Sequence, residues 1–202
     1  MFRFTPFSAA AIENRIVAAG LSRPSTPQFL SAEGLKQVRL PRFFVHDFSE
    51  SCIGRGLDAF AAAKRAFRAW TMFDLGWTRV ANAAATIQPG QLVVVEVHAL
   101  GLWALNISRI VDLADDPHRF GFVYATTALH VEEGEERFLL TLDPDSGEVR
   151  YTLEAVSRPH SKLAWLGYPV TRAFQHRFAR DSHRKMRRAL EGEVLAPDSR
   201  RV

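Results

Sequence analysis

The chain has a single cysteine, Cys52, among its 202 residues, so a disulfide within the chain is excluded. A reducing, cytoplasmic location is the expectation that follows. Long hydrophobic runs are also missing. The longest comparable stretch, residues 92–105, is interrupted by Glu96, His98 and Gly101 and falls short of the roughly 18 residues that span a bilayer. We therefore expect no membrane span.

Sequence motifs for metals, nucleotides and nucleophiles are absent too. The seven histidines are scattered, with no His-x-His or His-Glu-x-x-His spacing, and a lone cysteine cannot form Cys-x-x-Cys. There is no Gly-x-Gly-x-x-Gly, no phosphate-binding Walker loop and no Gly-x-Ser-x-Gly. We expect no dedicated metal site and no cofactor, and no motif identifies a catalytic residue.

What is present describes an ordinary globular chain, with 47% hydrophobic and 24% charged residues. Its length suits one main domain with an appendage. Turn-forming residues before Pro41 and the polar composition after residue 192 predict three parts. These are an N-terminal helix with an irregular linker (1–40), one domain (41–192) and a polar tail (193–202).

Periodicity predicts the elements within these parts. Ser8 as an N-cap and Gly20 as a stop predict a helix over 8–19. Apolar residues at spacings of three and four predict a helix over 57–70, and two distinct faces predict a long helix over 170–191. Strands are expected at 42–49, 77–87, 91–99, 102–112, 119–130, 135–142 and 148–157. Short turns separate the last six strands, including one at residues 132–135, and short loops require antiparallel pairing. The sequence therefore predicts a six-stranded meander followed by a long helix.

A curved antiparallel sheet of this kind needs a cover for one face, and the C-terminal helix is long enough to provide it. The prediction is an α+β fold of the helix-grip (START-like) type. About seven strands would wrap on the C-terminal helix, and an extra helix would lie at the N-terminus. In helix-grip proteins such as START domains and birch-pollen-allergen-like proteins, a cavity lies between sheet and helix.

Several short segments resemble the bacterial members of uncharacterised protein family 0548. They include Trp70-Thr71-Met72-Phe73-Asp74-Leu75-Gly76-Trp77, Gly101-Leu102-Trp103-Ala104-Leu105-Asn106, Gly121-Phe122-Val123-Tyr124 and Gly167-Tyr168-Pro169. The resemblance covers roughly residues 20–190. It implies a helix-grip fold and, by analogy with helix-grip proteins, a small apolar or amphipathic ligand.

Candidate ligand-binding residues come from the predicted last helix and two strands. Polar Gln175 and Ser182 share a helix face with Phe178 and Met186, which is typical either of a bonded core or of a cavity wall. On the strand 102–112, alternation places Asn106 on one face, and it places Trp103 and Arg109 on the other. Tyr124 on the next strand completes the candidate set.

Two further interpretations concern charged groups. Arg109 lies in a bulky apolar row, so it either pairs with a carboxylate such as Glu96 or anchors a ligand. Glu135 and Glu136 are expected at a hairpin mouth, solvated or paired with arginine. The basic excess begins at Arg177, where 8 basic and 4 acidic residues follow, and a solvated helix face explains it.

The sequence leaves three functions open. The first is binding of a small hydrophobic or amphipathic molecule between sheet and helix. The second is an enzyme of the cyclase or dehydratase type in the same cavity, with Glu96, His98, Arg109 and Tyr124 as candidates for its chemistry. The third is an interaction protein that uses the basic helix face, with no nucleic-acid partner expected.

Overall fold

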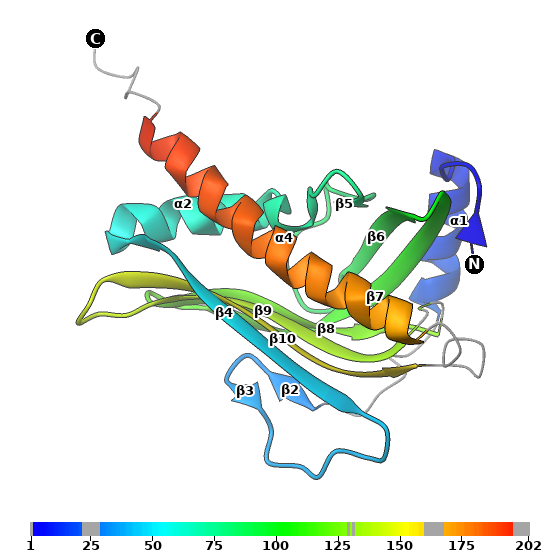
Figure 1. Ribbon diagram of the computed structural model, residues 1–202, viewed down its shortest axis with the longest axis horizontal. Helices are drawn as coiled ribbons and strands as arrows, with labels where there is room; N and C mark the ends of the chain where they lie inside the picture. Colours follow the sequence, from blue (N-terminus) through cyan, green and yellow to red (C-terminus); the bar gives the residue numbers. More distant parts are fainter. Residues whose placement is uncertain (1, 22–28, 129, 131, 160–167, 196–202) are drawn as a thin grey trace.

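The computed structural model describes residues 2–21, 29–128, 130, 132–159 and 168–195. In this part of the chain a curled antiparallel sheet carries the C-terminal helix across one face (Figure 1). The elements are β1 (Phe2–Arg3), α1 (Ala9–Gly20), β2 (Leu30–Ser31), β3 (Gly34–Leu35), β4 (Val45–Arg55), α2 (Gly56–Arg68), η1 (Thr71–Phe73), β5 (Thr78–Val80), β6 (Leu92–Ala99), β7 (Leu102–Asp115), β8 (Arg119–Thr126), β9 (Glu132–Leu142), β10 (Glu148–Pro159) and α4 (Tyr168–Leu195).

Seven strands form the main path of the sheet, in the order β4-β10-β9-β8-β7-β6-β5. Every neighbouring pair on this path is antiparallel, so β5 to β10 form the predicted meander and β4 extends its far edge. The short β1 pairs with the start of β7, beyond the end of β8. The predicted helix-grip fold is confirmed.

Two kinds of irregularity accompany the curl of the sheet. The register of β7 against β8 shifts between Ile110 and Asp112, and that of β10 against β4 shifts between Val149 and Arg150. Such bulges bend a strand and increase its twist. Gly134 lies where β9 approaches β10 so closely that a Cβ atom would sit 2.3 Å from the Val156 carbonyl oxygen. Only glycine fits this position.

The two faces of the sheet are covered differently. Helices α4 and α2 and the turn η1 pack on the inner face, where a large core contains Phe67, Trp70, Phe73, Phe122, Phe138, Tyr151 and Met186. On the outer face, Phe7 and residues of α1 pack against β6 and β7. The β2–β3 hairpin covers another part of the outer face, where Phe29 and Leu30 contact Val123 and Val156 (Figure 1).

Several predicted boundaries differ from the structure. Of the strand expected at 77–87, only Thr78–Val80 forms, and the Asn82 side chain then pairs with the backbone of Leu92 and Val94. Helix α4 begins before residue 170 and ends after residue 191. Parts of the predicted linker (22–28) and of the tail (196–202) lie outside the described residues.

The hairpin loop expected at residues 132–135 is wrong. These residues begin strand β9, which continues without interruption from Glu132 to Leu142. Gly134 suggested a turn, but it serves the close approach of β9 to β10. Because strand side chains alternate, the correction places Glu132 and Glu136 on the inner face, and Glu133 and Glu135 on the outer face.

Candidate functional site

The inner face of the sheet holds some of the candidate residues and excludes others. Trp103 belongs to the outer face of β7, where its ring stacks on His98 at a centroid distance of 4.3 Å, in the cluster beneath α1. The expectation that Trp103 lines the space between sheet and helix is therefore wrong. Alternation gives two faces to a strand, but the residue types did not reveal which face lies beneath α4.

Arg109 is on the same outer face and has a structural task. Its Nη2 atom donates to the carbonyl oxygens of Ala19 at 3.0 Å and Gly20 at 3.3 Å, at the C-terminal end of α1. A cation at this end of a helix is favourable because the last carbonyl groups carry partial negative charge. The expected partner Glu96 instead forms an ion pair with Arg79 at 2.6 Å.

Most of the residues predicted to carry the chemistry of a cyclase-type site do not face the space between the sheet and α4. Glu96, His98 and Arg109 all lie on the outer face, and only Tyr124 of that set lies on the inner face. The set predicted for acid–base chemistry is therefore not assembled.

Ser182 and Met186 lie on the predicted face of α4 but in its packed half. The Ser182 hydroxyl is fully buried and hydrogen-bonds the Tyr151 hydroxyl at 2.8 Å. Met186 is fully buried in the main core. For Ser182, the bonded-core alternative is the one that the contacts support.

The N-terminal half of α4 covers a cavity of about 140 Å³, which we call the larger cavity. The residues around it come from η1, β5 to β9 and α4. They are Phe73, Trp77, Thr78, Val95, Val97, Asn106, Tyr124, His130, Glu132, Glu136, Thr171, Phe174, Gln175 and Phe178. Four of the predicted residues, Asn106, Tyr124, Gln175 and Phe178, thus lie around one space.

The wall of the larger cavity is mostly aromatic where helix α4 and the segment before β5 meet. Phe73 packs against Phe178 with ring centroids 5.4 Å apart, and Trp77 packs against Phe174 at 5.8 Å. The Trp77 indole nitrogen donates to Asp181 of α4 at 3.2 Å, which fixes this ring at the edge of the helix. Ring packing and this hydrogen bond therefore fix the aromatic side chains that form the wall.

The sheet side of the larger cavity is polar. The Tyr124 hydroxyl donates to a carboxylate oxygen of Glu136 at 2.7 Å, across the β8–β9 pair. On the same strand, both carboxylate oxygens of Glu132 accept from the Gln175 amide at 2.9 and 2.8 Å. Asn106 contributes a side-chain oxygen that is buried and has no hydrogen-bond partner among the described residues. Three acceptor groups therefore converge on one space.

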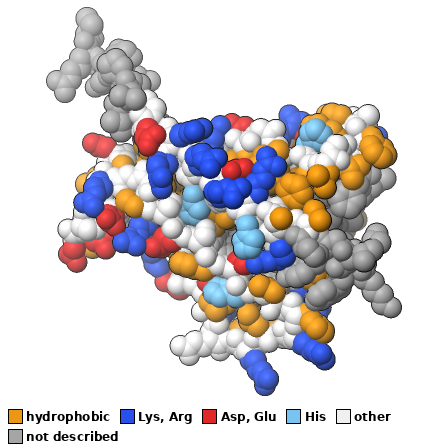
Figure 2. Space-filling view, in the orientation of Figure 1, with side chains coloured by type: hydrophobic (Ala, Val, Ile, Leu, Met, Phe, Trp, Pro, Cys, Tyr) orange, Lys and Arg blue, Asp and Glu red, His pale blue; other side chains and the backbone are white. Residues whose placement is uncertain are grey.

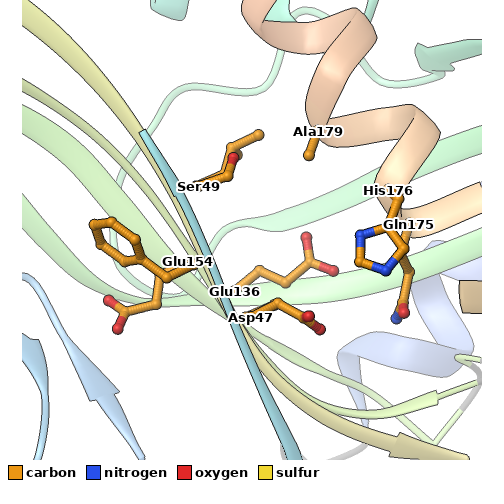
Figure 3. Close-up of a pocket in the computed structure, with 10 residues that line it drawn as sticks. Asp47, Ser49, Glu136, Glu154, Gln175, His176 and Ala179 are labelled. Carbon is orange, nitrogen blue, oxygen red and sulfur yellow. The ribbon is translucent and has the colours of Figure 1, made fainter. Parts of the chain in front are cut away.

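A second cavity of about 120 Å³, the smaller cavity, lies beside the first, and Glu136 and Gln175 line both. Figure 3 shows Asp47 and Glu136 beneath α4, near Gln175 and His176, whereas Glu154 points to the other side of the strand. Arg172 of α4 binds both carboxylate oxygens of Asp47 and donates to Gln175 at 3.0 Å. Gln175 is thus oriented between a cation and an acid.

Burial changes the acidity of these groups. Loss of solvation raises the pKa of Glu132 to about 7, and the nearby Glu136 adds to the rise. Burial also raises the pKa of Glu136, partly offset by the hydrogen bond from Tyr124. The pKa of Tyr124 lies well above its usual value for the same reason, so its hydroxyl stays protonated. A carboxyl group that titrates near neutral pH can accept or release a proton there.

The sequence placed Glu136 at a hairpin mouth and did not assign Glu132 or Glu136 to this site, because the glycine between them suggested a turn. A signal was present. The alternating buried series Phe138, Leu140, Leu142 can be extended backwards in steps of two to Glu136, Gly134 and Glu132. Continued alternation across a glycine favours a strand over a turn.

Charge on the outer surface of α4 is less one-sided than the sequence suggests. Figure 2 shows lysine and arginine side chains gathered along α4 with acidic groups between them. Asp181 lies 3.3 Å from Arg177, 4.0 Å from Arg180 and 3.5 Å from Arg184. Part of the basic charge is therefore neutralised within the helix.

The described residues form neither a helix that could span a membrane nor a cluster of metal ligands. No described helix is both long and apolar enough to cross a membrane. Within the same residues, no three His, Cys, Asp or Glu side chains are grouped so that they could hold a metal ion.

Comparison with known proteins agrees with the fold. Residues 30–185 match a family described as a domain of unknown function, DUF1990. A UPF0548 protein of Dictyostelium discoideum is 36% identical over 149 residues, 68% of this chain and 69% of that protein. A UPF0548 protein of Deinococcus radiodurans is 31% identical over 195 residues, 92% of this chain and 95% of that protein.

Among solved structures, the ZhuI aromatase/cyclase from Streptomyces sp. R1128 is similar, with a TM-score of 0.52. The similarity covers 77% of this chain and 98% of that chain, at 15% sequence identity. At that identity the likeness shows a shared fold. The resemblance to uncharacterised protein family 0548 is confirmed, and the chain belongs to the DUF1990 (UPF0548) family.

Proposed function

We propose that this protein binds a small amphipathic molecule in the larger cavity between the sheet and helix α4. The supporting observation is the contrast between its two sides. Aromatic and aliphatic side chains form the wall, and a few hydrogen-bonding groups lie on the sheet side. Ligand sites typically combine an apolar lining with a small number of placed polar groups.

The size of the cavity sets the size of the part that it encloses. A dry cavity of roughly 150 Å³ in another protein holds benzene. The larger cavity has a similar volume of about 140 Å³ and therefore suits one six-membered ring with a short polar substituent. A larger molecule would extend into the smaller cavity past Glu136 and Gln175.

The buried oxygen of Asn106 supports the same proposal. A buried acceptor without a donor costs about 1–3 kcal/mol, and such groups are uncommon in native structures. A ligand that donates to this oxygen would remove the cost. Catalysis in this cavity would begin with the same binding step, so binding is the function to test first.

The test uses three probes of similar shape, namely benzyl alcohol, benzylamine and benzoate. In an NMR titration of labelled protein, binding of at least one probe should shift the Asn106 side-chain amide and the Trp77 indole N–H. The variant Val97→Phe fills the cavity from β6 and should abolish these shifts. The variant Val17→Phe makes the same exchange at an exposed site on α1 and should leave them unchanged.

Two results would contradict the proposal. One is that no probe shifts these signals at millimolar concentration. The other is that Val97→Phe binds the probes as well as the unmodified protein does, because binding would then occur elsewhere.

A further inference from the structure

The charges around the two cavities do not balance. In the described part of the chain, three carboxylates face this space from the sheet, namely Asp47, Glu132 and Glu136. Glu154 also borders the smaller cavity, but its carboxylate points to the other side of the strand and pairs with Arg137. One cation and two neutral donors contact the three carboxylates that face the space. The cation is Arg172, which binds Asp47 through both carboxylate oxygens. Glu132 receives the amide of Gln175, and Glu136 receives the hydroxyl of Tyr124.

The hydrogen-bonding groups are one-sided as well. An ionised carboxylate has about four acceptor positions, so Glu132 and Glu136 can each accept further donors. The Asn106 side-chain oxygen accepts none in the described structure. Hydrogen-bond acceptors predominate on the sheet side of the larger cavity. The complementary group of a ligand is therefore a donor with more than one N–H.

The opposite wall suits an apolar body that carries a positive charge. The rings of Phe73, Trp77, Phe174 and Phe178 line the larger cavity. Aromatic faces attract cations, and the attraction is stronger in a desolvated site. One example already exists at the edge of this wall, where the Arg177 guanidinium lies 4.6 Å from the centre of the Trp77 ring.

We infer that the ligand of this cavity is an organic cation: a protonated amine, or another N–H cation, on a small apolar body. The charged group would lie between Glu132, Glu136 and Asn106, and the apolar body would lie against Phe178. This inference rests on the proposed function and names the chemical class of its ligand. A bound cation would supply the charged partner that the Glu132 and Glu136 carboxylates lack among the described residues.

Binding should depend on pH because these carboxyl groups must ionise. The titratable and charged groups around the two cavities are Asp47 on β4, Tyr124 on β8, Glu132 and Glu136 on β9, His130 before β9, and Arg172 and His176 on α4. Burial raises the pKa of Glu132 to about 7. The affinity for an amine that stays protonated should therefore rise between pH 6 and pH 8, with release of a proton on binding.

The experiment compares the same three probes by calorimetry and NMR, at pH 6 and at pH 8. Benzylamine should bind about tenfold or more tightly than benzyl alcohol or benzoate at pH 8, because hydrogen bonds between charged groups are the strong ones. Its affinity should fall at pH 6, and the affinity for benzyl alcohol should not. Calorimetry in two buffers of different ionisation enthalpy measures the proton released.

Glutamine variants locate the charge without changing the shape of the site. Glu132→Gln and Glu136→Gln should each remove most of the preference for benzylamine. The matched control is Glu133→Gln, because Glu133 lies on the outer face of the same strand and pairs with Arg158. That variant should keep the full preference.

Each alternative outcome is decisive. If benzyl alcohol or benzoate binds as tightly as benzylamine at the Asn106 and Trp77 signals, the cation inference is wrong and the proposed function stands. If benzylamine keeps its advantage in both Glu132→Gln and Glu136→Gln, the inference is also wrong. If no probe binds, both proposals fail.

Discussion

Glu132 affects both the stability of the protein and the ionisation of the larger cavity. The carboxyl group is buried, accepts from the Gln175 amide through both of its oxygens, and lies near Glu136. Burial makes the ionised form unfavourable, which raises the pKa to about 7. The folded state therefore holds a proton that the unfolded state releases nearer its ordinary pKa of 4.5.

The sign of the pH dependence follows. A carboxyl group whose pKa is raised in the folded state lowers stability as pH rises from about 4.5 through 7. A difference of about 2.5 pKa units corresponds to about 3 kcal/mol. In Glu132→Gln this loss should be absent, so the variant should gain up to about 3 kcal/mol relative to the parent between pH 5 and pH 8.

Urea denaturation at both pH values measures this gain, and Glu133→Gln is the control that should not show it. Equal pH dependence in the Glu132→Gln variant and its parent would mean that Glu132 titrates in the folded protein as it does in water.

For single residues, the sequence predicted the position well where the helical periodicity was clear. Gln175 and Phe178 were placed on the covered face of the last helix, and both line the larger cavity. Ser182 and Met186 share that face, but their end of the helix packs on the core. Periodicity gives the direction of a side chain around the helix axis, and it does not say where along the helix a space remains.

Among the elements, the β2–β3 hairpin depends on one buried acid. A carboxylate oxygen of Glu135 accepts the backbone N–H groups of Phe29 at 2.6 Å and Leu30 at 2.7 Å. Glu135 is fully buried on the outer face of β9, and burial raises its pKa. These bonds fix the segment before β4 against the sheet.

Removing this acid should loosen the hairpin. Glu135→Ala leaves two buried N–H groups without an acceptor, and each such group costs about 1–3 kcal/mol. We expect the variant to lose at least about 2 kcal/mol of stability and the Phe29 and Leu30 amides to exchange faster with solvent. Hydrogen exchange by NMR measures the second effect, and Glu135→Gln, which keeps an acceptor oxygen, should retain most of the protection.

Unchanged exchange at both amides in Glu135→Ala would show that other contacts hold the hairpin. The stability loss alone would not identify the cause, so the two amides are the signals that decide.

The sequence predicted elements where turns were marked by more than one residue. Asp143-Pro144-Asp145-Ser146-Gly147 correctly separates β9 from β10. A single glycine was a weaker guide, because Gly134 relieves a contact between strands instead of forming a turn. Strand β5 is short because, after one more backbone hydrogen bond from Ala81 to Val94, the Asn82 side chain replaces the backbone in the bonding to β6.

In the whole molecule, two different layers cover one sheet. Helix α4 closes the inner face, and α1 with the β2–β3 hairpin covers the outer face. The predicted fold followed from the order of elements, because a meander with short loops and one long amphipathic helix has few compact arrangements. The site did not follow in the same way, because Trp103 and Arg109 serve the attachment of α1.

A crystal structure of the protein grown with benzylamine tests the central claim most directly. We predict that the ring lies in the larger cavity against Phe178, with the ammonium group hydrogen-bonded to Glu132 or Glu136. Benzylamine found only on the outer surface, with side chains filling the space beneath α4, would contradict the claim that this cavity is a binding site.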